Sequence, residues 1–178
     1  MKGCKAWFLD RDGTIIEDCC YLGDPSKVRL LENAAEALRL AQEAGYLLIV
    51  VTNQSGIGRG YFTEEAADRV DQRMAELLEE YGVKLTACYR CPHWPGGYAP
   101  YNVICDCRKP KTGLFQKAIA DYDIDPEQSI ACGDKLRDIE RLPDLGIQPK
   151  HLGVIAPDGY PNLLSFFLAV HHVETVDF

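Results

Sequence analysis

Residues 6–15 constrain the fold more than any other stretch of this 178-residue chain. The apolar first half of the stretch is typical of a short buried β-strand that ends at Asp10. Asp10 and Asp12 are two residues apart, so strand geometry places both carboxylates on one side, at the carboxyl end of a sheet. Ligands of open α/β sheets bind at that edge. Two neighbouring carboxylates repel each other, which predicts a bridging cation, and Mg²⁺ fits oxygen ligands best.

An isolated Asp-x-Asp is more often a solvated turn, so the interpretation depends on the rest of the chain. Strands are also predicted at 46–51, 85–89, 129–132 and 151–155, with a terminal strand at 173–176. Helices are predicted over 33–41, 63–81, 112–122 and 163–170, and another begins near Leu136 and is limited by Pro143. This alternation predicts an α/β fold: a three-layer, doubly wound parallel sheet in a single domain over residues 1–178.

Composition excludes several classes of protein. The formal net charge of -8 argues against nucleic acid and anionic membranes as partners. No apolar run approaches the roughly 18 residues of a membrane span. The first five residues lead directly into the predicted strand and leave no room for a signal peptide. We therefore expect a cytoplasmic protein, acting as a monomer, with no nucleic-acid or membrane partner.

Polar residues that follow the predicted strands suit phosphoryl transfer. Asp10 is the candidate nucleophile, forming an aspartyl-phosphate, and Asp12 is the candidate general acid and base. Asp134 would complete a Mg²⁺ shell with Asp10 and the backbone carbonyl of Asp12. Thr52 offers a hydroxyl and an N–H to phosphoryl oxygens, and Lys109 offers a positive charge to the developing negative charge.

Four motifs together resemble the haloacid dehalogenase superfamily of phosphatases: FLDRDGTI at 8–15, TNQSGIGRG at 52–60, CDCRKP at 105–110 and GDK at 133–135. More narrowly, they resemble its branch without a large cap domain, which includes heptose bisphosphate and histidinol phosphate phosphatases. The resemblance covers about residues 7–147. It implies the catalytic roles given above for Asp10, Asp12, Thr52, Lys109 and Asp134. It also implies a set of substrate-binding residues: Arg11, Asp18, Tyr21, Asn53, Gln54, Ser55, Arg59, Arg108 and Lys135.

Four potential metal ligands gather in the loop at about 90–110. Cys91, His93, Cys105 and Cys107 are clustered in a way that indicates metal ligation rather than a disulfide framework. In this branch the pattern implies a closed, tetrahedral and structural Zn²⁺ site. The zinc would staple the loop and aim the residues directly after Cys107 at the active site. The alternative is a surface loop with free thiols.

Loop lengths bear on the substrate. Eleven residues separate His93 from Cys105, and this length resembles the heptose enzymes of the branch. The resemblance implies a Mg²⁺-dependent phosphatase that removes the C7 phosphate of a small phosphorylated sugar, D-glycero-D-manno-heptose 1,7-bisphosphate, in lipopolysaccharide biosynthesis. The alternatives are a phosphatase for histidinol phosphate or another small phosphomonoester, a phospho-accepting signalling domain and a non-catalytic zinc-binding module.

Overall fold

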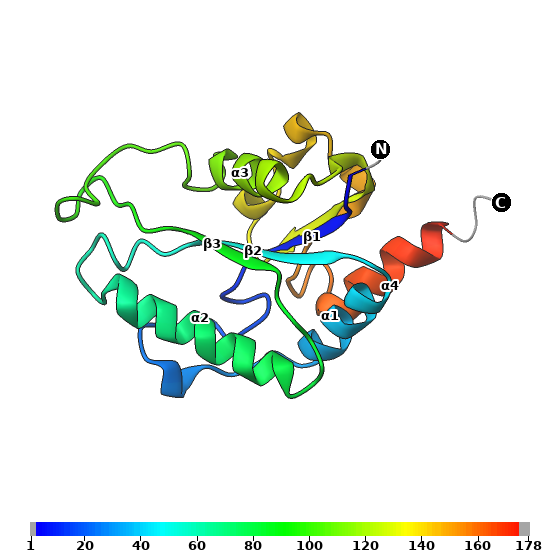
Figure 1. Cartoon of the computed structure of the whole chain (residues 1–178), viewed down its shortest axis with the longest axis horizontal. Coiled ribbons are helices and arrows are strands. Elements are labelled where there is room, and N and C mark those ends of the chain that lie inside the picture. The colour runs from blue at the N-terminus through cyan, green and yellow to red at the C-terminus, as the bar shows by residue number, and fades with distance from the viewer. Residues whose placement is uncertain (1–2, 175–178) are drawn as a thin grey trace.

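Five parallel strands form a single sheet in the order β3-β2-β1-β4-β5 in the computed structural model, which describes residues 3–174 (Figure 1). The central strand β1 pairs with β2 on one side and with β4 on the other. The strand bounds are β1 Ala6–Leu9, β2 Leu47–Asn53, β3 Ala87–Cys91, β4 Ile130–Gly133 and β5 Leu152–Val154. The chain winds outward from β1 to β3 and then returns to the other side of β1, which confirms the predicted doubly wound sheet.

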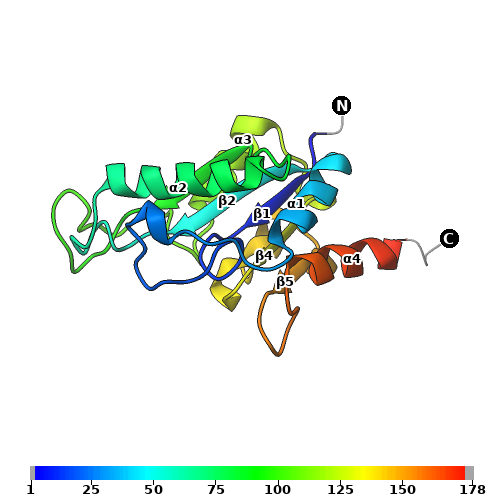
Figure 2. The ribbon, with the colours of Figure 1, turned by 90° about the horizontal axis from the view of Figure 1, so that it is seen from below.

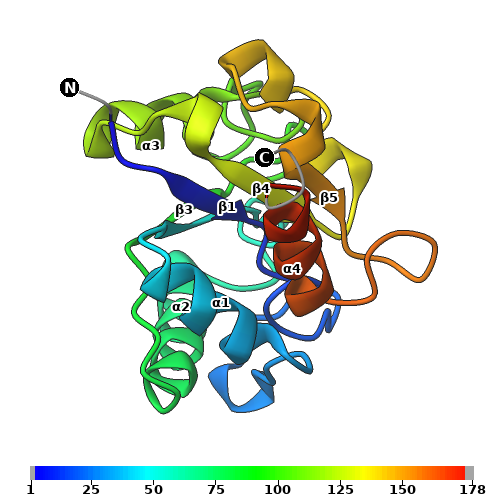
Figure 3. The same cartoon turned by 90° about the vertical axis from the view of Figure 1, so that its right-hand side faces the viewer.

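Helices cover both faces of the sheet and make three layers (Figures 2 and 3). One face is covered by α1 Ala34–Glu43, α2 Glu64–Glu79 and α4 Leu163–Glu174. The other face is covered by α3 Gly113–Tyr122 together with residues of short 3-10 helices. The 3-10 helices are η1 Pro25–Lys27, η2 Pro126–Gln128, η3 Leu136–Asp138, η4 Leu142–Leu145 and η5 Pro149–His151. Within residues 3–174 no further domain is inserted as a cap.

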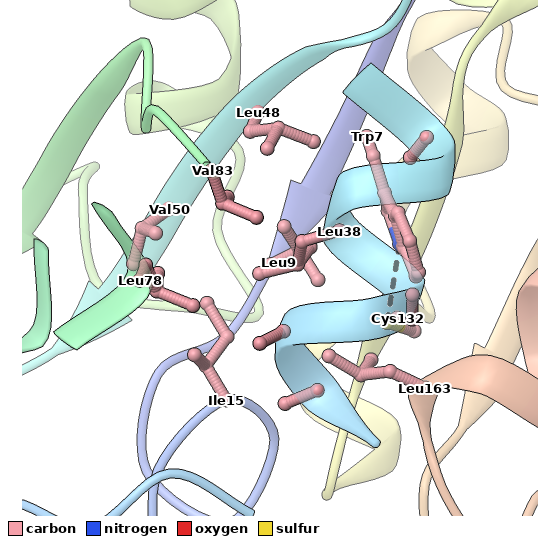
Figure 4. Close-up of a cluster of buried hydrophobic side chains, with 14 of the residues drawn as sticks. Trp7, Leu9, Ile15, Leu38, Leu48, Val50, Leu78, Val83, Cys132 and Leu163 are labelled. Carbon is pink, nitrogen blue, oxygen red and sulfur yellow. Dashed lines mark hydrogen bonds between the residues drawn. The ribbon is translucent and has the colours of Figure 1, made fainter. Parts of the chain in front are cut away.

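Strand β1 is fixed on both of its faces. Trp7 and Leu9 point into the core beneath α1, α2 and α4 (Figure 4), and Phe8 points into the opposite core against Phe115 of α3. The indole N–H of Trp7 also donates to Cys132 Sγ on β4, at 3.3 Å. Burying a large apolar side chain such as Leu9 or Phe8 contributes about 1.5–3 kcal/mol to the free energy of folding. The end of β1, where Asp10 begins, is therefore held rigidly.

Three predicted elements differ from the structure. The strand predicted at 85–89 lies two residues later, so that β3 ends on Cys91 itself. The helix predicted from Leu136 is replaced by η3 and η4, because Asp138 turns back to accept the N–H of Lys135 and because Gly146, at φ 100°, ends η4. Of the predicted terminal strand, residues 173–174 belong to α4, and residues 175–178 lie outside the described part of the chain.

None of the helices described is both long enough and apolar enough to cross a membrane.

Candidate active site and metal-binding loop

The carboxyl ends of the strands meet around one cavity of about 340 Å³. Asp10 follows β1, Asn53 ends β2 and Asp134 follows β4. These side chains converge because parallel strands all end at the same edge of the sheet. The structure brings most of the predicted site residues to this cavity: Asp10, Asp12, Asp18, Tyr21, Asn53, Gln54, Ser55, Arg59, Arg108, Asp134 and Lys135.

A buried ion triad forms the floor of the site. Lys109 Nζ lies 2.8 Å from Asp10 Oδ1 and 2.8 Å from Asp138 Oδ1, and it donates to the carbonyl of Val51 at 2.6 Å. Burial works against the charge on Lys109, but the two carboxylates raise its pKa. Burial raises the pKa of Asp10, and Lys109 offsets part of that effect. Lys109 thus holds Asp10 in one orientation and keeps a positive charge beneath the cavity.

The carboxylate of Asp12 is held by two donors. Gln54 Nε2 donates to Asp12 Oδ2 at 2.7 Å and also to Thr52 Oγ1 at 2.8 Å. Arg11 donates to both oxygens of Asp12 at 3.2 Å. The polar groups at the end of β2 thereby fix the position of Asp12 relative to β1.

Arg11, which the resemblance implies as a substrate-binding residue, has its side chain turned away from the cavity. It is fully buried and is absent from the cavity lining, so its guanidinium does not meet a ligand there. Its second partner is Asp71 of α2, at 2.7 Å. Burial works against its charge, but Asp12 and Asp71 raise its pKa. Its role is to orient Asp12, and Asp71 went unnoticed in the sequence because nothing near it marks a buried ion pair.

Thr52 and Lys109 lie below the cavity surface, at 1% and 3% exposure. Asn53 joins their two segments, since its side-chain amide donates to the Lys109 carbonyl at 3.1 Å and accepts the Lys109 N–H at 2.9 Å. This reciprocal pair fixes the segment after Cys107 to the end of β2.

Carboxylate oxygens of Asp10, Asp134 and Asp138 lie within 4.8 Å of one another, an arrangement suited to a hard divalent cation. Asp138 already accepts from Lys109 Nζ and from the N–H of Lys135. Both oxygens of Asp138 are thus taken, whereas Asp10 accepts from Lys109 through Oδ1 alone, so we expect Asp10 and Asp134 to be the side-chain ligands. The side chain of Asp12 points to Gln54 and Arg11, so any contribution to a metal would come from its backbone carbonyl, as the sequence predicts.

Close packing at this edge requires glycine at two positions. A Cβ on Gly13, which has φ 77°, would lie 2.6 Å from Asp134 Oδ2. A Cβ on Gly133 would lie 2.3 Å from the Asp138 side chain. The glycines of the two acidic motifs thus let the carboxylates approach each other.

The four predicted soft ligands come together at the end of β3. Their ligand atoms all lie within 4.8 Å of one another, with Cys91 Sγ 3.5 Å from His93 Nδ1 and 3.6 Å from Cys105 Sγ. These separations are close to the edge of about 3.8 Å of a tetrahedron with Zn–S bonds of about 2.3 Å. Burial raises the pKa of Cys91, Cys105 and Cys107, and only at Cys105 do hydrogen bonds from Cys107 and from nearby backbone N–H groups outweigh that effect and bring the pKa down, to about 6. The positions of the four ligand atoms therefore carry the fit to a closed zinc site.

One aromatic side chain beside the cavity, Trp94, was not predicted from the sequence. The guanidinium carbon of Arg59 lies 3.6 Å from the centroid of the Trp94 ring, and that of Arg108 lies 5.2 Å from it. The predicted residue Tyr21 also contacts Arg59, with its ring centroid 5.4 Å from the guanidinium carbon. A tryptophan inside a metal-binding loop gives no sequence signal of such a role. The cavity also takes in Cys20, Leu22 and Arg137, which were not predicted to bind substrate.

Comparisons with known proteins agree with this geometry. Residues 5–142 match the family described as polynucleotide kinase 3 phosphatase. D-glycero-beta-D-manno-heptose-1,7-bisphosphate 7-phosphatase from Haemophilus ducreyi is 48% identical over 151 residues, which are 84% of this chain and 83% of that protein.

Two solved structures share the fold. A HAD-like phosphatase from Mesorhizobium loti has a TM-score of 0.82 and 31% identity, over 97% of this chain and 88% of that one. D,D-heptose 1,7-bisphosphate phosphatase from B. bronchiseptica, complexed with magnesium and phosphate, has a TM-score of 0.73 and 25% identity, over 96% and 99% of the two chains. The chain belongs to the polynucleotide kinase 3 phosphatase family, among the HAD-like phosphatases.

Proposed function

We propose that this chain is a Mg²⁺-dependent phosphatase that removes the C7 phosphate of D-glycero-D-manno-heptose 1,7-bisphosphate. The observation that carries the proposal is the pair of acids after β1, with Asp10 held by Lys109 and Asp12 held by Arg11 and Gln54. The similarity to the Haemophilus ducreyi enzyme supports the choice of substrate.

In the first step, an Asp10 carboxylate oxygen forms a bond to the C7 phosphorus while the bond to the sugar oxygen breaks. Asp12 gives its proton to the departing alkoxide, and the sugar leaves as an alcohol. Lys109 and the Thr52 segment stabilise negative charge on the phosphoryl oxygens from below. Gln54 matters here because it positions Asp12 and Thr52 with the same amide nitrogen.

In the second step, Asp12 takes a proton from water, and the water oxygen attacks the phosphorus of the aspartyl-phosphate. The bond between phosphorus and Asp10 breaks, which releases inorganic phosphate and restores the free carboxylate. Asp10, Asp134 and the carbonyl of Asp12 would hold Mg²⁺, which when bound neutralises charge on the transferring phosphoryl group.

We place Zn²⁺ on Cys91, His93, Cys105 and Cys107 as a structural ion. Arg108 and Lys109 directly follow Cys107, the last ligand. A closed metal site therefore fixes the backbone from which both side chains extend. A hydrogen bond supports this role: Arg108 Nη1 donates to the backbone carbonyl of His93, one of the four ligands, at 3.2 Å.

For the substrate, the cavity offers several cations at its rim, among them Arg59, Arg108, Lys135 and Arg137, in a chain whose overall charge is negative. A bisphosphate uses these cations better than a monophosphate with an amine tail, such as histidinol phosphate. We place the enzyme in the cytoplasm as a monomer, without nucleic-acid or membrane partners, in the supply of heptose for lipopolysaccharide.

A steady-state screen tests the proposal. It compares the α and β anomers of heptose 1,7-bisphosphate with histidinol phosphate, fructose 1,6-bisphosphate and a 3′-phosphorylated oligonucleotide. We expect one heptose anomer to give the highest kcat/KM by at least about tenfold. Equal turnover of histidinol phosphate would refute the proposed substrate. Preference for the oligonucleotide would instead indicate the activity in the family's description, that of a polynucleotide 3′ phosphatase. A stable phospho-Asp10 without phosphate release would instead indicate a signalling domain.

A further inference from the structure

Arg59 and Arg108 carry positive charges that no carboxylate of the described residues neutralises, a property that they share with Arg137 among the cations lining the cavity. Both line the cavity that contains Asp10. Within the described part of the chain, no carboxylate oxygen lies within 4.0 Å of either guanidinium, whereas Arg11 and Lys109 are each paired with two carboxylates. Two cations without a countercharge that face one cavity indicate that the ligand itself brings the negative charge.

Trp94 holds these two arginines in place. Its ring lies against the Arg59 guanidinium at 3.6 Å and also within reach of Arg108 at 5.2 Å. Two further side-chain contacts restrain Arg59: a hydrogen bond from Nε to Ser55 Oγ at 3.3 Å, and the Tyr21 ring at 5.4 Å from the guanidinium carbon. A ring face attracts a guanidinium without neutralising it, so it can orient the cation and leave its N–H groups for a ligand.

Backbone contacts fix the ring relative to Arg59. The N–H of Gly58 donates to the carbonyl of Pro92 at 3.0 Å, and the carbonyl of Gly58 accepts from Tyr98 at 2.9 Å. A Cβ on Gly58 would lie 2.9 Å from the backbone nitrogen of Trp94, so only glycine lets the two loops approach this closely. Trp94 and the residue next to Arg59 therefore belong to one packed unit, which Figure 1 shows as the loops after β2 and β3 extending together beyond the sheet.

We propose that Trp94 is a positioning residue that presets Arg59 and Arg108 for the phosphate that is not transferred, and so selects doubly phosphorylated substrates. This inference rests on the proposed function and adds a residue that acts through the arginines, not on the reacting phosphate. Presetting removes the cost of ordering two long side chains when the substrate binds. The effect should therefore appear in substrate affinity and depend on the second phosphate.

The test measures kcat and KM for the zinc-loaded enzyme with heptose 1,7-bisphosphate and with heptose 7-phosphate. We expect Trp94→Ala to raise KM for the bisphosphate about tenfold, to change kcat by less than about twofold, and to leave the monophosphate KM nearly unchanged. Trp94→Phe keeps a ring face and should restore most of the affinity. Ile104→Ala is the matched control, because Ile104 lies in the same loop and its side chain is 84% exposed.

A double-mutant cycle shows whether Trp94 acts through Arg59. In an Arg59→Ala background, Trp94→Ala should raise the bisphosphate KM much less than it does in the wild-type enzyme. Equal losses for both substrates, full additivity with Arg59→Ala, or loss of bound zinc from Trp94→Ala would overturn the inference in favour of general loop packing. No change in KM would overturn it as well.

The wild-type enzyme separates this inference from the proposed function. If it does not prefer heptose 1,7-bisphosphate, the proposed function fails, and Trp94→Ala is judged on whichever doubly phosphorylated sugar turns over fastest, against its monophosphate. If the heptose substrate is preferred and Trp94→Ala behaves like Ile104→Ala, only the inference fails. If no doubly phosphorylated sugar is turned over, both fail.

Discussion

The floor and the rim of the cavity are built on opposite principles. At the floor, Lys109 is buried between two carboxylates, with its Nζ 2.8 Å from Asp10 Oδ1 and 2.8 Å from Asp138 Oδ1. At the rim, Arg59 and Arg108 have no carboxylate partner among the described residues and rest on an aromatic ring. The floor gathers around Asp10 at the end of β1, whereas both rim arginines lie on loops.

The difference separates chemistry from selection. A nucleophile must be held in one geometry, and a saturated network of charges within a rigid sheet provides it. A substrate-binding cation must keep its charge available, and an aromatic support does that. The consecutive residues Arg108 and Lys109 join the two parts, because one faces the cavity and the other lies beneath it.

Replacing Asp10 gives the most severe test of the floor. Asp10→Asn should lower phosphate release by more than about 10⁴-fold, because an amide cannot form the aspartyl-phosphate. Single-turnover phosphate release measures the loss. Asp144→Asn is the control, because it removes an exposed carboxylate paired only with Arg141. Activity above about 1% of wild type would remove Asp10 as the nucleophile.

Removing the cation tests whether the floor is held by its charges. Lys109→Met leaves Asp10 and Asp138 buried without their shared partner, which should cost about 3–5 kcal/mol of unfolding free energy. Activity should fall by about 10²–10³-fold. Urea unfolding and steady-state kinetics measure the two effects.

Lys117→Met is the matched control for Lys109, because Lys117 makes an exposed i,i+4 pair with Asp121. It should cost less than about 1 kcal/mol. If the two variants lose similar stability, the buried triad does not hold the floor together.

The sequence predicted the floor better than the rim for a physical reason. Asp10 and Asp134 each follow a strand and Thr52 is the last residue but one of β2, and topology alone brings the ends of parallel strands together. The contacts of Trp94 with two arginines depend on how two loops pack, which no periodicity encodes. The orientation of Arg11 was hard to predict for the same reason: its position beside Asp12 suggests the cavity, but its side chain turns inward to Asp71.

The metal-binding loop connects floor and rim, so disturbing it should weaken both. Cys107→Ser should lower bound zinc from about one ion per chain to well below that, and kcat/KM by about 10–100-fold. Elemental analysis and kinetics on the same sample measure both. Cys4→Ser is the control, because Cys4 is exposed and lies outside the ligand cluster. Full zinc content in Cys107→Ser, or wild-type protein without zinc after Mg²⁺ is stripped by mild chelation, would contradict the closed site.

The smallest expected effect concerns the support of Asp12. Asp68 and Asp71 both pair with Arg90, but their side chains are 67% and 16% exposed, and only Asp71 also holds Arg11. Asp71→Asn should lower kcat by about tenfold and cost about 1.5–3 kcal/mol of stability, because Arg11 loses a charged hydrogen bond in a fully buried position.

Asp68→Asn removes an exposed partner and should change the unfolding free energy by less than about 1 kcal/mol, with kcat unaltered. KM should stay constant in both variants, because neither residue reaches the rim. A rise in KM for Asp71→Asn would mean that the network around Arg11 extends to substrate binding, and the separation between floor and rim would then fail at Asp12, which Arg11 and Gln54 position.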